Sequence, residues 1–538
     1  MSSQFPLDIV NPDAPSSPPA RRDPAGRSFI EVQLPVSKLS KESYTERKAV
    51  AGQTLTSLGK WWGRKPLVLV RAIILGLLLP ATDDPNADRE TFLALMTMDD
   101  DGMWRRAGET LPVRAAYQEA LSHERTQFFE VDDDKIRWRK GVSAAQKRQM
   151  QRRAFLRMGY DRRLEFCKRP EEVDGPSVEA WARINAHLGT NAKSLPELIR
   201  QLGGEAFGHT PVVGDACCGG GSIPFEAARI GCNAYGSDLN PAAALLTWGA
   251  LNIIGGGEQV VDRVRAAQQR VFDAVRRQVD AWGIERNEQG WVADAYLYCN
   301  EVIDPTTGWR VPLAPSWVIA PKHNVIARLV PDYANKRFGI EVVEGVSAPE
   351  LAQADKEGTW DDGVISPVDR EGHWLSSEER QRTSMNQLRG REGLRPWENN
   401  DLEPRPSDVF QERLYCIRWR EMLRLPNGRE VIRYHYRSPT PADLQREGRV
   451  LGLLRENFDD WQRQGYIPSR GIEPGEDINR PLNARGWRFW HHFFNPRQLL
   501  LNGLFAKEVA HDKGIEGAAL LLMIGTRLLC FASSNASC

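Results

Sequence analysis

The sequence predicts an α/β protein that combines a Rossmann-like core with an N-terminal helical extension and a large β-rich or mixed insertion. Three patterns support this fold class. A strand, a glycine turn, a helix and a second strand follow one another over residues 211–238. An apolar helix pattern at 67–79 precedes them, and an amphipathic helix pattern at 257–282 follows. A Trp- and Pro-rich stretch comes next at 287–481, with short β-like runs at 316–320, 325–331 and 430–436. With 538 residues, 41% of them apolar, the chain is long enough for several domains.

These patterns divide the chain into five expected parts. The first is rich in Pro, Ser and Arg, and its low apolar content predicts disorder. The parts are a disordered tail (1–27), an N-terminal domain with a basic helical segment (28–205), one half of the core with the candidate cofactor site (206–285), an inserted module for which target recognition is one interpretation (286–481) and a return to the core, expected to be truncated (482–538).

Charge and cysteine content exclude several classes of protein. The 71 Lys and Arg residues balance 71 Asp and Glu, so no overall field draws the chain onto nucleic acid or membrane. Eight Cys, of which only Cys217 and Cys218 lie close in sequence, do not form a disulfide scaffold. The N-terminus lacks a signal-peptide pattern, and the longest apolar run is well short of the roughly 20 residues that span a bilayer. We expect a cytoplasmic protein with no membrane partner.

The N-terminal domain has three local signals. Phe29–Val32 alternates like a short strand. The helix expected at 67–79 begins at Pro66, whose missing N–H does no harm there, and Pro80 ends it. Residues 135–169 carry thirteen Lys or Arg against two acids. Their helical spacing fits a solvated amphipathic helix or a face for nucleic-acid phosphates. The candidate phosphate-binding residues there are Arg152, Arg153 and Arg157.

The glycine turn is the stretch that points to chemistry. A strand delivers Asp215 to its carboxyl end, and Gly219, Gly220 and Gly221 then let the backbone approach a ligand closely. The helix expected at 222–230 presents its N-terminus to that ligand. Asp238, after the second strand, has the position of a carboxylate that accepts hydrogen bonds from ribose hydroxyls.

Two cofactor classes fit this turn. A dinucleotide site should read G-x-G-x-x-G, whereas Pro224 stands at the last position here. Asp215 would repel a pyrophosphate but suits the ammonium group of a methionine moiety. The pattern therefore favours S-adenosylmethionine over NAD, with a ligand-free α/β domain as the remaining alternative.

Longer motifs carry a resemblance to a known family. The runs D-A-C-C-G-G-G-S at 215–222 and S-D-L-N-P at 237–241 resemble the cofactor motifs of adenine-specific DNA methylases. Those proteins open with a domain of unknown function, which F-I-E-V-Q-L-P at 29–35 and W-W-G-R-K-P-L at 61–67 resemble, and F-N-P-R-Q-L-L at 494–500 resembles a third block. Within the family, the chain looks closest to members of phage-defence gene clusters.

The resemblance implies a Rossmann-like, S-adenosylmethionine-dependent methyltransferase core that acts on the N6 amino group of adenine in DNA. It also implies DNA as a partner. The cofactor-binding residues that it implies are Asp215, Cys217, Gly219, Gly220, Gly221, Asp238 and Asn240.

The chain departs from the family pattern in three places. Ala216 and Cys217 replace a Pro-Phe pair beside the cofactor. Cys299 and Cys416 have no partner at Cys-x-x-Cys spacing, so we expect no metal. Methylation of the adenine amino group needs an (Asn/Asp)-Pro-Pro-aromatic loop, which holds the flipped base, and the 538 residues contain none. The catalytic residues are therefore unknown.

The missing loop leaves several functions open. The abrupt change of texture at 530–538 suggests a truncated or frameshifted copy, or else a family variant with a short polar tail. One alternative is a non-catalytic, DNA-associated scaffold or cofactor-binding subunit that joins an ATPase or helicase of a defence complex. A weaker alternative is an RNA methylase of similar fold.

A few other residues admit two interpretations. Arg64 fits a structural role equally well as a contact to the cofactor carboxylate or a DNA phosphate. Trp61 and Trp62 suit the core better than a stacking platform. The adjacent His491 and His492 do not have the spacing of metal ligands.

Overall fold

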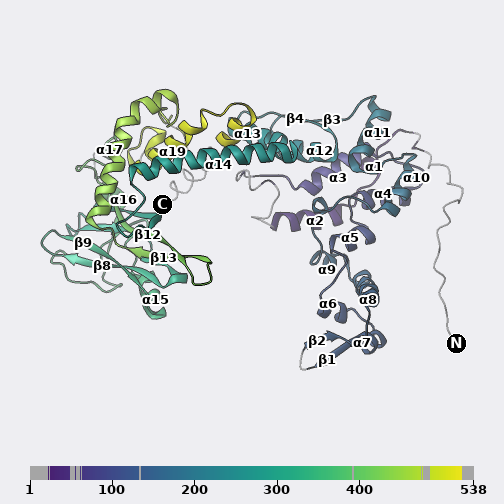
Figure 1. Cartoon of the computed structure of the whole chain (residues 1–538), viewed down its shortest axis with the longest axis horizontal. Helices are drawn as coiled ribbons and strands as arrows, with labels where there is room; N and C mark the ends of the chain where they lie inside the picture. Colours follow the sequence, from purple (N-terminus) through teal and green to yellow (C-terminus); the bar gives the residue numbers. More distant parts are fainter. Residues whose placement is uncertain are drawn as a thin grey trace. The chain divides into compact units, whose positions relative to one another are not determined.

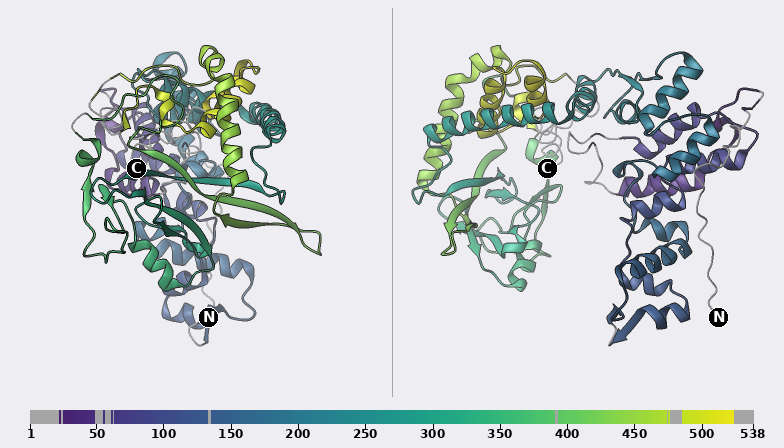
Figure 2. Two further views of the ribbon diagram at one scale, coloured as in Figure 1. Left: turned by 90° about the vertical axis from the view of Figure 1, so that its left-hand side faces the viewer. Right: turned by 45° about the vertical axis from the view of Figure 1, so that its right-hand side comes forward.

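The computed structural model describes residues 22–48 except Pro24, then Leu55 and Trp61, and the ranges 63–132, 135–390, 393–473, Gly475 and 485–523. The described chain forms two compact units. Unit 1 ends at Asp262 and unit 2 begins at Arg263, which places the division inside the long helix α14 (Gly257–Trp282). The ribbon runs from purple to teal through unit 1 and from teal to yellow through unit 2 (Figures 1 and 2). Most of the expected N-terminal tail, Trp62 and the segment 530–538 lie outside the described residues.

Unit 1 is mainly helical, as the sequence predicts for the N-terminal extension. Two short strand pairs, one antiparallel and one parallel, interrupt the helices. Its helices are α1 (Phe29–Val32), α2 (Val36–Lys48), α3 (Leu67–Leu78), α4 (Pro85–Leu95), α5 (Asp100–Arg106), α6 (Val113–Gln118), α7 (Ser122–Phe128), α8 (Ala144–Arg157), α9 (Tyr160–Leu164), η2 (Pro170–Glu172), α10 (Val178–Leu188), α11 (Leu195–Phe207), α12 (Ser222–Ile230), α13 (Pro241–Gly249) and η3 (Ala250–Ile254), and its strands are β1 (Phe129–Asp132), β2 (Lys135–Trp138), β3 (Val212–Asp215) and β4 (Asn233–Gly236).

The start of unit 1 corrects two expectations. Phe29–Val32, predicted as a strand, is the single helical turn α1. Ser28 and Glu31 form a capping box in which the Glu31 carboxylate accepts hydrogen bonds from both Ser28 N–H and Oγ–H at 2.7 Å, and this capping outweighs a four-residue alternation. Residues 22, 23 and 25–27, predicted as part of the disordered tail, belong to the fold, since Asp23 N–H donates to Ala81 O at 2.8 Å and Ala81 N–H donates to Arg27 O at 3.0 Å.

The predicted apolar helix is confirmed as α3, and it lies at the centre of the unit. The Glu46 carboxylate accepts hydrogen bonds from the N–H groups of Leu67 and Val68, so a side chain of α2 caps the helix that Pro66 begins. Arg71 of α3 donates through Nε to Glu226 of α12 at 2.7 Å, and both side chains are buried. A buried ion pair of this geometry fixes α12 against α3, which lie side by side (Figure 1).

Unit 2 is a mixed α/β unit built on one seven-stranded sheet in the order β13-β12-β5-β6-β9-β8-β7, in which only β6 and β9 pair in parallel. The β-like runs predicted at 316–320, 325–331 and 430–436 are confirmed as parts of it. The strands are β5 (Val292–Ile303), β6 (Arg310–Leu313), β7 (Val318–Ala320), β8 (Val325–Asp332), β9 (Arg337–Glu344), β12 (Gln411–Arg424) and β13 (Glu430–Arg437), with a separate pair of β10 (Gly363–Ile365) and β11 (Arg382–Ser384), and the helices are η4 (Pro321–His323), α15 (Ala348–Lys356), α16 (Met385–Arg389), α17 (Pro441–Gln464), η5 (Trp490–Phe493) and α19 (Pro496–Val509).

The helices of unit 2 share a second core. Val271 and Val275 on the buried stripe of α14 pack with Leu454 of α17 and Leu500 of α19. The amphipathic helix predicted at 257–282 is confirmed, because its apolar stripe faces these two helices. None of the helices among the described residues is both long and apolar enough to cross a membrane.

His491 and His492 are buried structural groups of unit 2. His492 Nδ1 accepts hydrogen bonds from the N–H groups of Arg488 at 3.1 Å and Phe489 at 3.3 Å, so its proton is assigned to Nε2, which donates to Glu398 O at 3.0 Å. Burial lowers the pKa of His491 to about 4 and that of His492 to about 3. Both rings are therefore neutral at pH 7 and contribute as packed, hydrogen-bonded side chains.

This burial predicts a loss of stability in mild acid. The unfolded chain binds protons at these imidazoles below a pH of about 6.5, whereas the folded chain does not until pH 4 or lower, so stability falls as the pH drops through this window. We expect each histidine to lower the free energy of unfolding by on the order of 1–2 kcal/mol between pH 7 and pH 5. Urea unfolding at pH 7 and at pH 5 measures this change in the free energy of unfolding.

The matched variants are His491→Gln with His492→Gln and, as control, the exposed His373→Gln. The double variant should flatten the pH dependence whatever its absolute stability, and the control should keep the wild-type slope. A wild-type free energy of unfolding that stays constant between pH 7 and pH 5 would contradict the assignment.

Candidate functional site

The predicted β-α-β unit is confirmed in unit 1. Strands β3 and β4 pair in parallel with Val212 opposite Asn233 and Asp215 opposite Gly236, and α12 connects them. The carboxyl ends of parallel strands lie at the same edge, so the loops after Asp215 and Gly236 meet there. Ser237 N–H donates to Asp215 O and Cys218 N–H donates to Ser237 O, which ties the two loops together.

The structure brings Asp238 onto the glycine turn. Its Oδ2 accepts a hydrogen bond from Gly219 N–H and its Oδ1 accepts one from Asn240 N–H, both at 2.9 Å. These N–H groups, first that of Asn240 and then that of Gly219, hold the pKa of Asp238 below its ordinary value. An ionised carboxylate therefore stands where the two strands end, beside a turn in which Gly219 and Gly221 have φ of +51° and +79°.

The other predicted cofactor residues occupy different surroundings. Asp215 lies at the end of β3, and its Oδ1 accepts a hydrogen bond from Cys217 N–H at 3.1 Å. Cys217 is exposed, whereas Cys218 is buried and its Sγ accepts a hydrogen bond from Thr247 Oγ1 at 3.2 Å. Asn240 caps α13, because its Oδ1 accepts from Ala242 N–H at 3.0 Å. The predicted residues therefore lie on two adjoining loops that hydrogen bonds connect. Asn240 also caps a helix.

Trp61 and Arg64, which belong to the W-W-G-R-K-P-L run at 61–67, contact this turn from far away in the sequence. A Cβ atom on Gly219 would lie 2.7 Å from Trp61 Nε1, and one on Gly220 would lie 2.6 Å from Arg64 Nε and 3.0 Å from Trp61 Cβ. A Cβ atom at either position would force Trp61 or Arg64 to move. The glycines are therefore needed for the close approach of Trp61 and Arg64 as well as for the turn itself.

Arg64 brings a positive charge to the turn. Burial lowers the pKa of Arg64 to about 10, which leaves the guanidinium charged at neutral pH. Arg64 thus lies beside the glycine turn, against Gly220. Trp61, expected as a core residue, lies half-buried against the same turn.

Sequence reasoning missed two further residues of the site. Leu239 follows Asp238 and is fully exposed at 105%. An exposed apolar side chain in that position can contact a flat apolar group of a ligand, and an apolar residue directly after the second acid is the sequence signal that could have shown it. Thr247 of α13 lies under Gly221, where a Cβ would come within 3.0 Å of Thr247 Cα.

The basic segment is confirmed as helical over α8, and its three candidate arginines each lie beside an acid. Arg157 donates to both carboxylate oxygens of Glu124 at 2.5 and 2.9 Å, and this guanidinium lowers the pKa of Glu124 to about 2. Arg153 lies 3.5 Å from the same carboxylate and Arg152 lies 3.6 Å from Asp101. These ion pairs join α8 to α5 and α7 within the chain.

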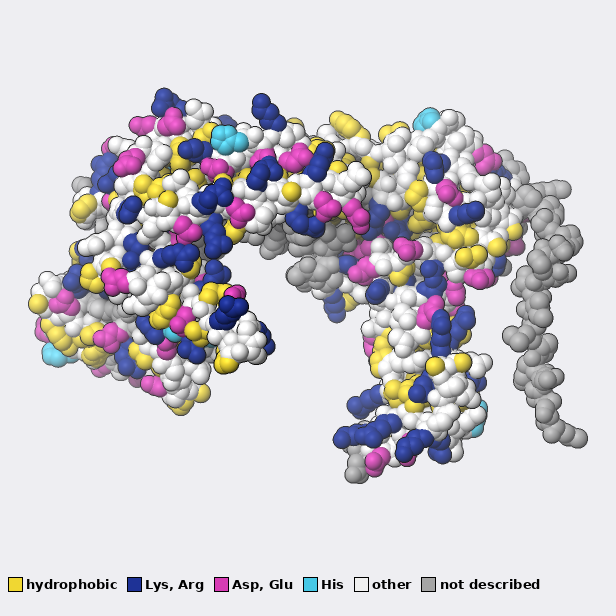
Figure 3. All heavy atoms as spheres, in the orientation of Figure 1, with side chains coloured by type: hydrophobic (Ala, Val, Ile, Leu, Met, Phe, Trp, Pro, Cys, Tyr) yellow, Lys and Arg dark blue, Asp and Glu magenta, His cyan; other side chains and the backbone are white. Residues whose placement is uncertain are grey.

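Other cations of the segment stay exposed. Basic side chains gather over the part of unit 1 that holds β1, β2 and α8 (Figure 3). Lys135, Arg137, Arg139 and Lys140 are exposed there and form no ion pair with any residue that the structure describes. The hairpin β1–β2 and the turn after it are thus better placed for an anionic partner than Arg157.

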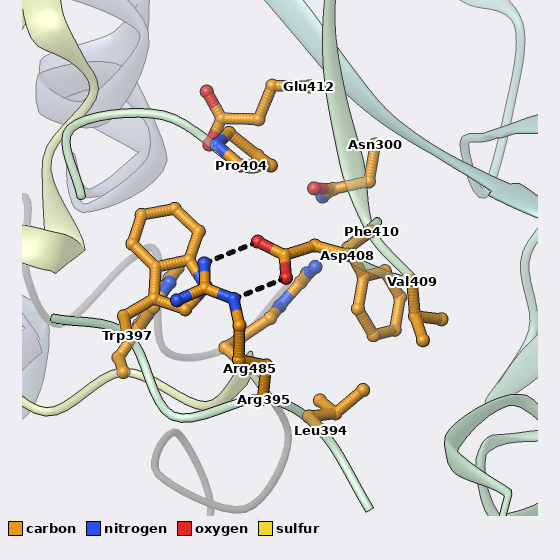
Figure 4. A pocket seen from close by; sticks show the side chains of 11 residues that line it. Asn300, Leu394, Arg395, Trp397, Pro404, Asp408, Val409, Phe410, Glu412 and Arg485 are labelled. Atoms are coloured by element: carbon orange, nitrogen blue, oxygen red, sulfur yellow. Dashed lines mark hydrogen bonds and ion pairs between the residues drawn. The ribbon is translucent and has the colours of Figure 1, made fainter. Parts of the chain in front are cut away.

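Unit 2 holds pockets of a different kind. The pocket in Figure 4 has a volume of about 30 Å³, enough for a single water, and its polar centre is the paired Arg395 and Asp408 at 2.7 and 2.8 Å.

Trp309, Trp317 and Trp419 of the inserted region are buried in cores, and Trp374 is half exposed. Of these four tryptophans, Trp374 is therefore the one available for contact with a target.

One group of side chains in the described residues has metal-ligand types. Asp369, Glu371 and His373 place one ligand atom each within 4.8 Å of one another on an exposed loop. His373 Nδ1 already pairs with Asp369 Oδ2 at 3.0 Å. Exposed acidic groups of this sort are common, and nothing else among the described residues of the loop points to an ion.

Comparison with known proteins matches the first part of the chain. The family model described as a protein of unknown function (DUF1156) matches residues 33–95, which run from before α2 to the end of α4 and include Trp61, Arg64 and Arg71. The chain thus carries an N-terminal domain of unknown function. No curated protein and no solved structure matches the chain.

Proposed function

We propose that unit 1 binds S-adenosylmethionine and that the chain is a DNA adenine-N6 methyltransferase-like protein of Rossmann-like core. The observation that carries the proposal is the ionised Asp238 on the backbone of the glycine turn, at the carboxyl ends of two parallel strands. Such an edge is where nucleoside cofactors bind in α/β sheets. The cofactor-binding residues in this proposal are those that surround the turn.

Each part of the cofactor has a chemically suitable partner. Asp238 would accept hydrogen bonds from the ribose hydroxyls, with Leu239 against the adenine ring. Asp215 would attract the ammonium group of the methionine moiety. Arg64, which lies over Gly220, would hold the carboxylate through its planar fork. Opposite charges for both ends of a zwitterion favour S-adenosylmethionine over NAD, which carries two phosphates.

The DUF1156 segment gains a role in this proposal. Its Trp61 and Arg64 lie on the glycine turn, and its Arg71 pairs with Glu226 of the helix that follows the turn. The segment therefore forms one wall of the cofactor site and holds α12 in place. The resemblance to adenine-specific DNA methylases, in defence-associated members above all, supports the same function.

The cofactor claim is tested by isothermal titration calorimetry with S-adenosylmethionine. We expect wild-type chain to bind, and Asp238→Ala to bind at least about tenfold more weakly, a loss of roughly 1.4 kcal/mol. The control is Asp84→Ala, which removes a carboxylate that likewise bonds two backbone N–H groups, those of Asn86 and Ala87, away from the turn. Equal affinity for wild type and Asp238→Ala, or binding of NAD alone, would overturn the proposal.

DNA binding is assigned to the exposed cations around the β1–β2 hairpin. The slope of log K against log salt should become shallower by about 0.9 for every phosphate that the protein no longer neutralises. We therefore expect Arg139→Gln with Lys140→Gln to flatten that slope in filter binding to a DNA duplex. The matched control is Arg152→Gln with Arg153→Gln, whose charges face acids, and it should keep the wild-type slope. A slope that flattens in Arg152→Gln with Arg153→Gln, and not in Arg139→Gln with Lys140→Gln, would contradict the assignment.

One feature favours a second candidate function. The 538 residues contain no (Asn/Asp)-Pro-Pro-aromatic loop. A chain that binds cofactor and DNA without that loop would act as a scaffold or cofactor-binding subunit, with a helicase or ATPase as partner. Transfer of a labelled methyl group to DNA by the purified chain would exclude this alternative, and cofactor binding without transfer would favour it.

A further inference from the structure

Two strands of the seven-stranded sheet continue beyond their neighbours as a two-stranded ribbon. Val292, the first residue of β5, pairs with Arg420 of β12, and β13 is the edge strand. The described residues therefore place no third strand beside residues 421–424 of β12 and their partners on β13. We refer to residues 420–434 as the arm. The left view of Figure 2 shows this green ribbon projecting from the rest of the sheet.

The arm carries guanidinium groups that have no acid beside them. Arg418, at its base, pairs with Asp294. Four arginines of the arm itself form no ion pair with any residue that the structure describes, namely Arg420, Arg424, Arg429 and Arg433. The arm has two acids, and one of them, Glu421, already pairs with His435 at 2.9 Å. The arm therefore presents positive charge to a partner.

One face of the arm combines this charge with apolar side chains. Because side chains alternate along a strand, Arg420, Met422 and Arg424 share a face. Tyr434 and Ile432, which lie opposite Arg420 and Met422 on β13, belong to the same face. Met422, Ile432 and Tyr434 are exposed at 56%, 46% and 38%. This face thus has an apolar centre with a guanidinium group before and after it along β12.

The shape and chemistry of this face fit the major groove of duplex DNA. Paired strands lie about 4.8 Å apart, so a ribbon with its side chains enters a groove that is about 12 Å wide. The major groove of duplex RNA is too narrow for side chains to read. In the DNA groove, the planar fork of an arginine binds O6 and N7 of guanine, and apolar side chains contact the methyl group of thymine.

We propose that the arm enters the major groove of duplex DNA and that Arg420 and Arg424 read guanine bases there. DNA as the partner rests on the proposed function, to which the arm adds the element that reads the base sequence. The cations around the β1–β2 hairpin contact phosphates in that function. Phosphate contacts give affinity without sequence information, whereas base contacts give specificity, so the two surfaces have separable effects.

Selection of bound DNA duplexes from a pool with a random central segment tests the arm. We expect the wild-type chain to enrich a sequence that contains guanine at fixed positions. Arg420→Gln with Arg424→Gln should lower the preference for those guanines at least about tenfold, because one bidentate contact discriminates by that factor or more. Arg139→Gln with Lys140→Gln should weaken the binding of all sequences and still enrich the wild-type sequence.

The matched control is Arg455→Gln with Arg463→Gln. These two exposed arginines of unit 2 lie on α17 and pair with Glu403 and Asp460. Their loss removes the same charge as the substitutions in the arm, and the selected sequence should not change. A control that loses the preference for guanine as fully as the arm variant would overturn the proposal.

A change in the DNA tests the same contact with the wild-type chain. Replacement of the selected guanines by 7-deazaguanine removes the N7 acceptor from the major groove alone, and we expect it to weaken binding about tenfold. Equal affinity for the two duplexes overturns the proposal. So does a wild-type chain that enriches no sequence, an arm variant that enriches the wild-type sequence, or equal affinity for an RNA duplex of the selected sequence.

Calorimetry with S-adenosylmethionine separates this proposal from the proposed function. Cofactor binding together with a selected sequence that ignores the arm overturns the role of the arm and leaves the cofactor site in place. A selected sequence that depends on Arg420 and Arg424, without cofactor binding, supports the arm and removes the proposed function.

Discussion

Under the proposed function, Gly219→Asn is expected to lower the affinity for S-adenosylmethionine by about 100-fold, equivalent to roughly 2.7 kcal/mol. Among residues with a Cβ, asparagine is one of those that best tolerate the positive φ of +51° at this position, so backbone strain alone does not explain such a loss. The added Cβ would lie 2.7 Å from Trp61 Nε1, within the hydrogen-bonded turn that positions Asp238. Either Trp61 or the turn must move, and movement of the turn displaces Asp238 from its position.

The matched control is Gly208→Asn. Gly208 also has a positive φ, of +75°, but a Cβ there meets nothing within 4 Å. Both variants carry the same side chain in a left-handed backbone conformation, and only one collides. Calorimetry should therefore show wild-type affinity for Gly208→Asn. Equal affinities for both variants would mean that the contact between the DUF1156 segment and the turn has no part in cofactor binding.

The parts of the fold that were predicted correctly depend on local pattern. The β-α-β unit, α3, α14 and the β-like runs of unit 2 follow from residue spacing that each segment carries within itself. The strand prediction for Phe29–Val32 was wrong because four residues are too few to distinguish alternation from one helical turn. There the Ser28–Glu31 capping box decides the conformation.

Contacts between distant segments could not be predicted. The approach of Trp61 and Arg64 to the glycine turn depends on how α3 packs on α12, which no local pattern encodes. The pairing of Arg157 with Glu124 likewise joins α8 to α7, two helices that no local pattern brings together. The strand order of the seven-stranded sheet, in which β5 lies beside β12, is non-local in the same way.

Arg497→Met is expected to destabilise unit 2 by about 3–5 kcal/mol. Arg497 is buried, donates to Glu285 Oε1 at 2.5 Å and to Glu447 Oε1 at 3.1 Å, and lies 3.9 Å from the centre of the Tyr296 ring. Both carboxylates also accept hydrogen bonds from tyrosines, Tyr296 at Glu285 and Tyr298 at Glu447. Removal of the cation leaves these two partly buried carboxylates without the positive charge that they share.

Three measurements separate this cause from simple loss of packing. Urea unfolding should show most of the stability restored when Glu285→Gln and Glu447→Gln accompany Arg497→Met, because the triple variant buries no charge. Arg463→Met, which removes an exposed ion pair of α17 with Asp460, should cost less than about 1 kcal/mol. Burial already raises the pKa of Glu285 and Arg497 opposes that rise, so loss of the cation raises this pKa further, and the stability of the Arg497→Met variant should increase as the pH falls from 7 to 5. A loss that the triple variant retains in full would locate the effect in the packing of Arg497 on Tyr296 instead.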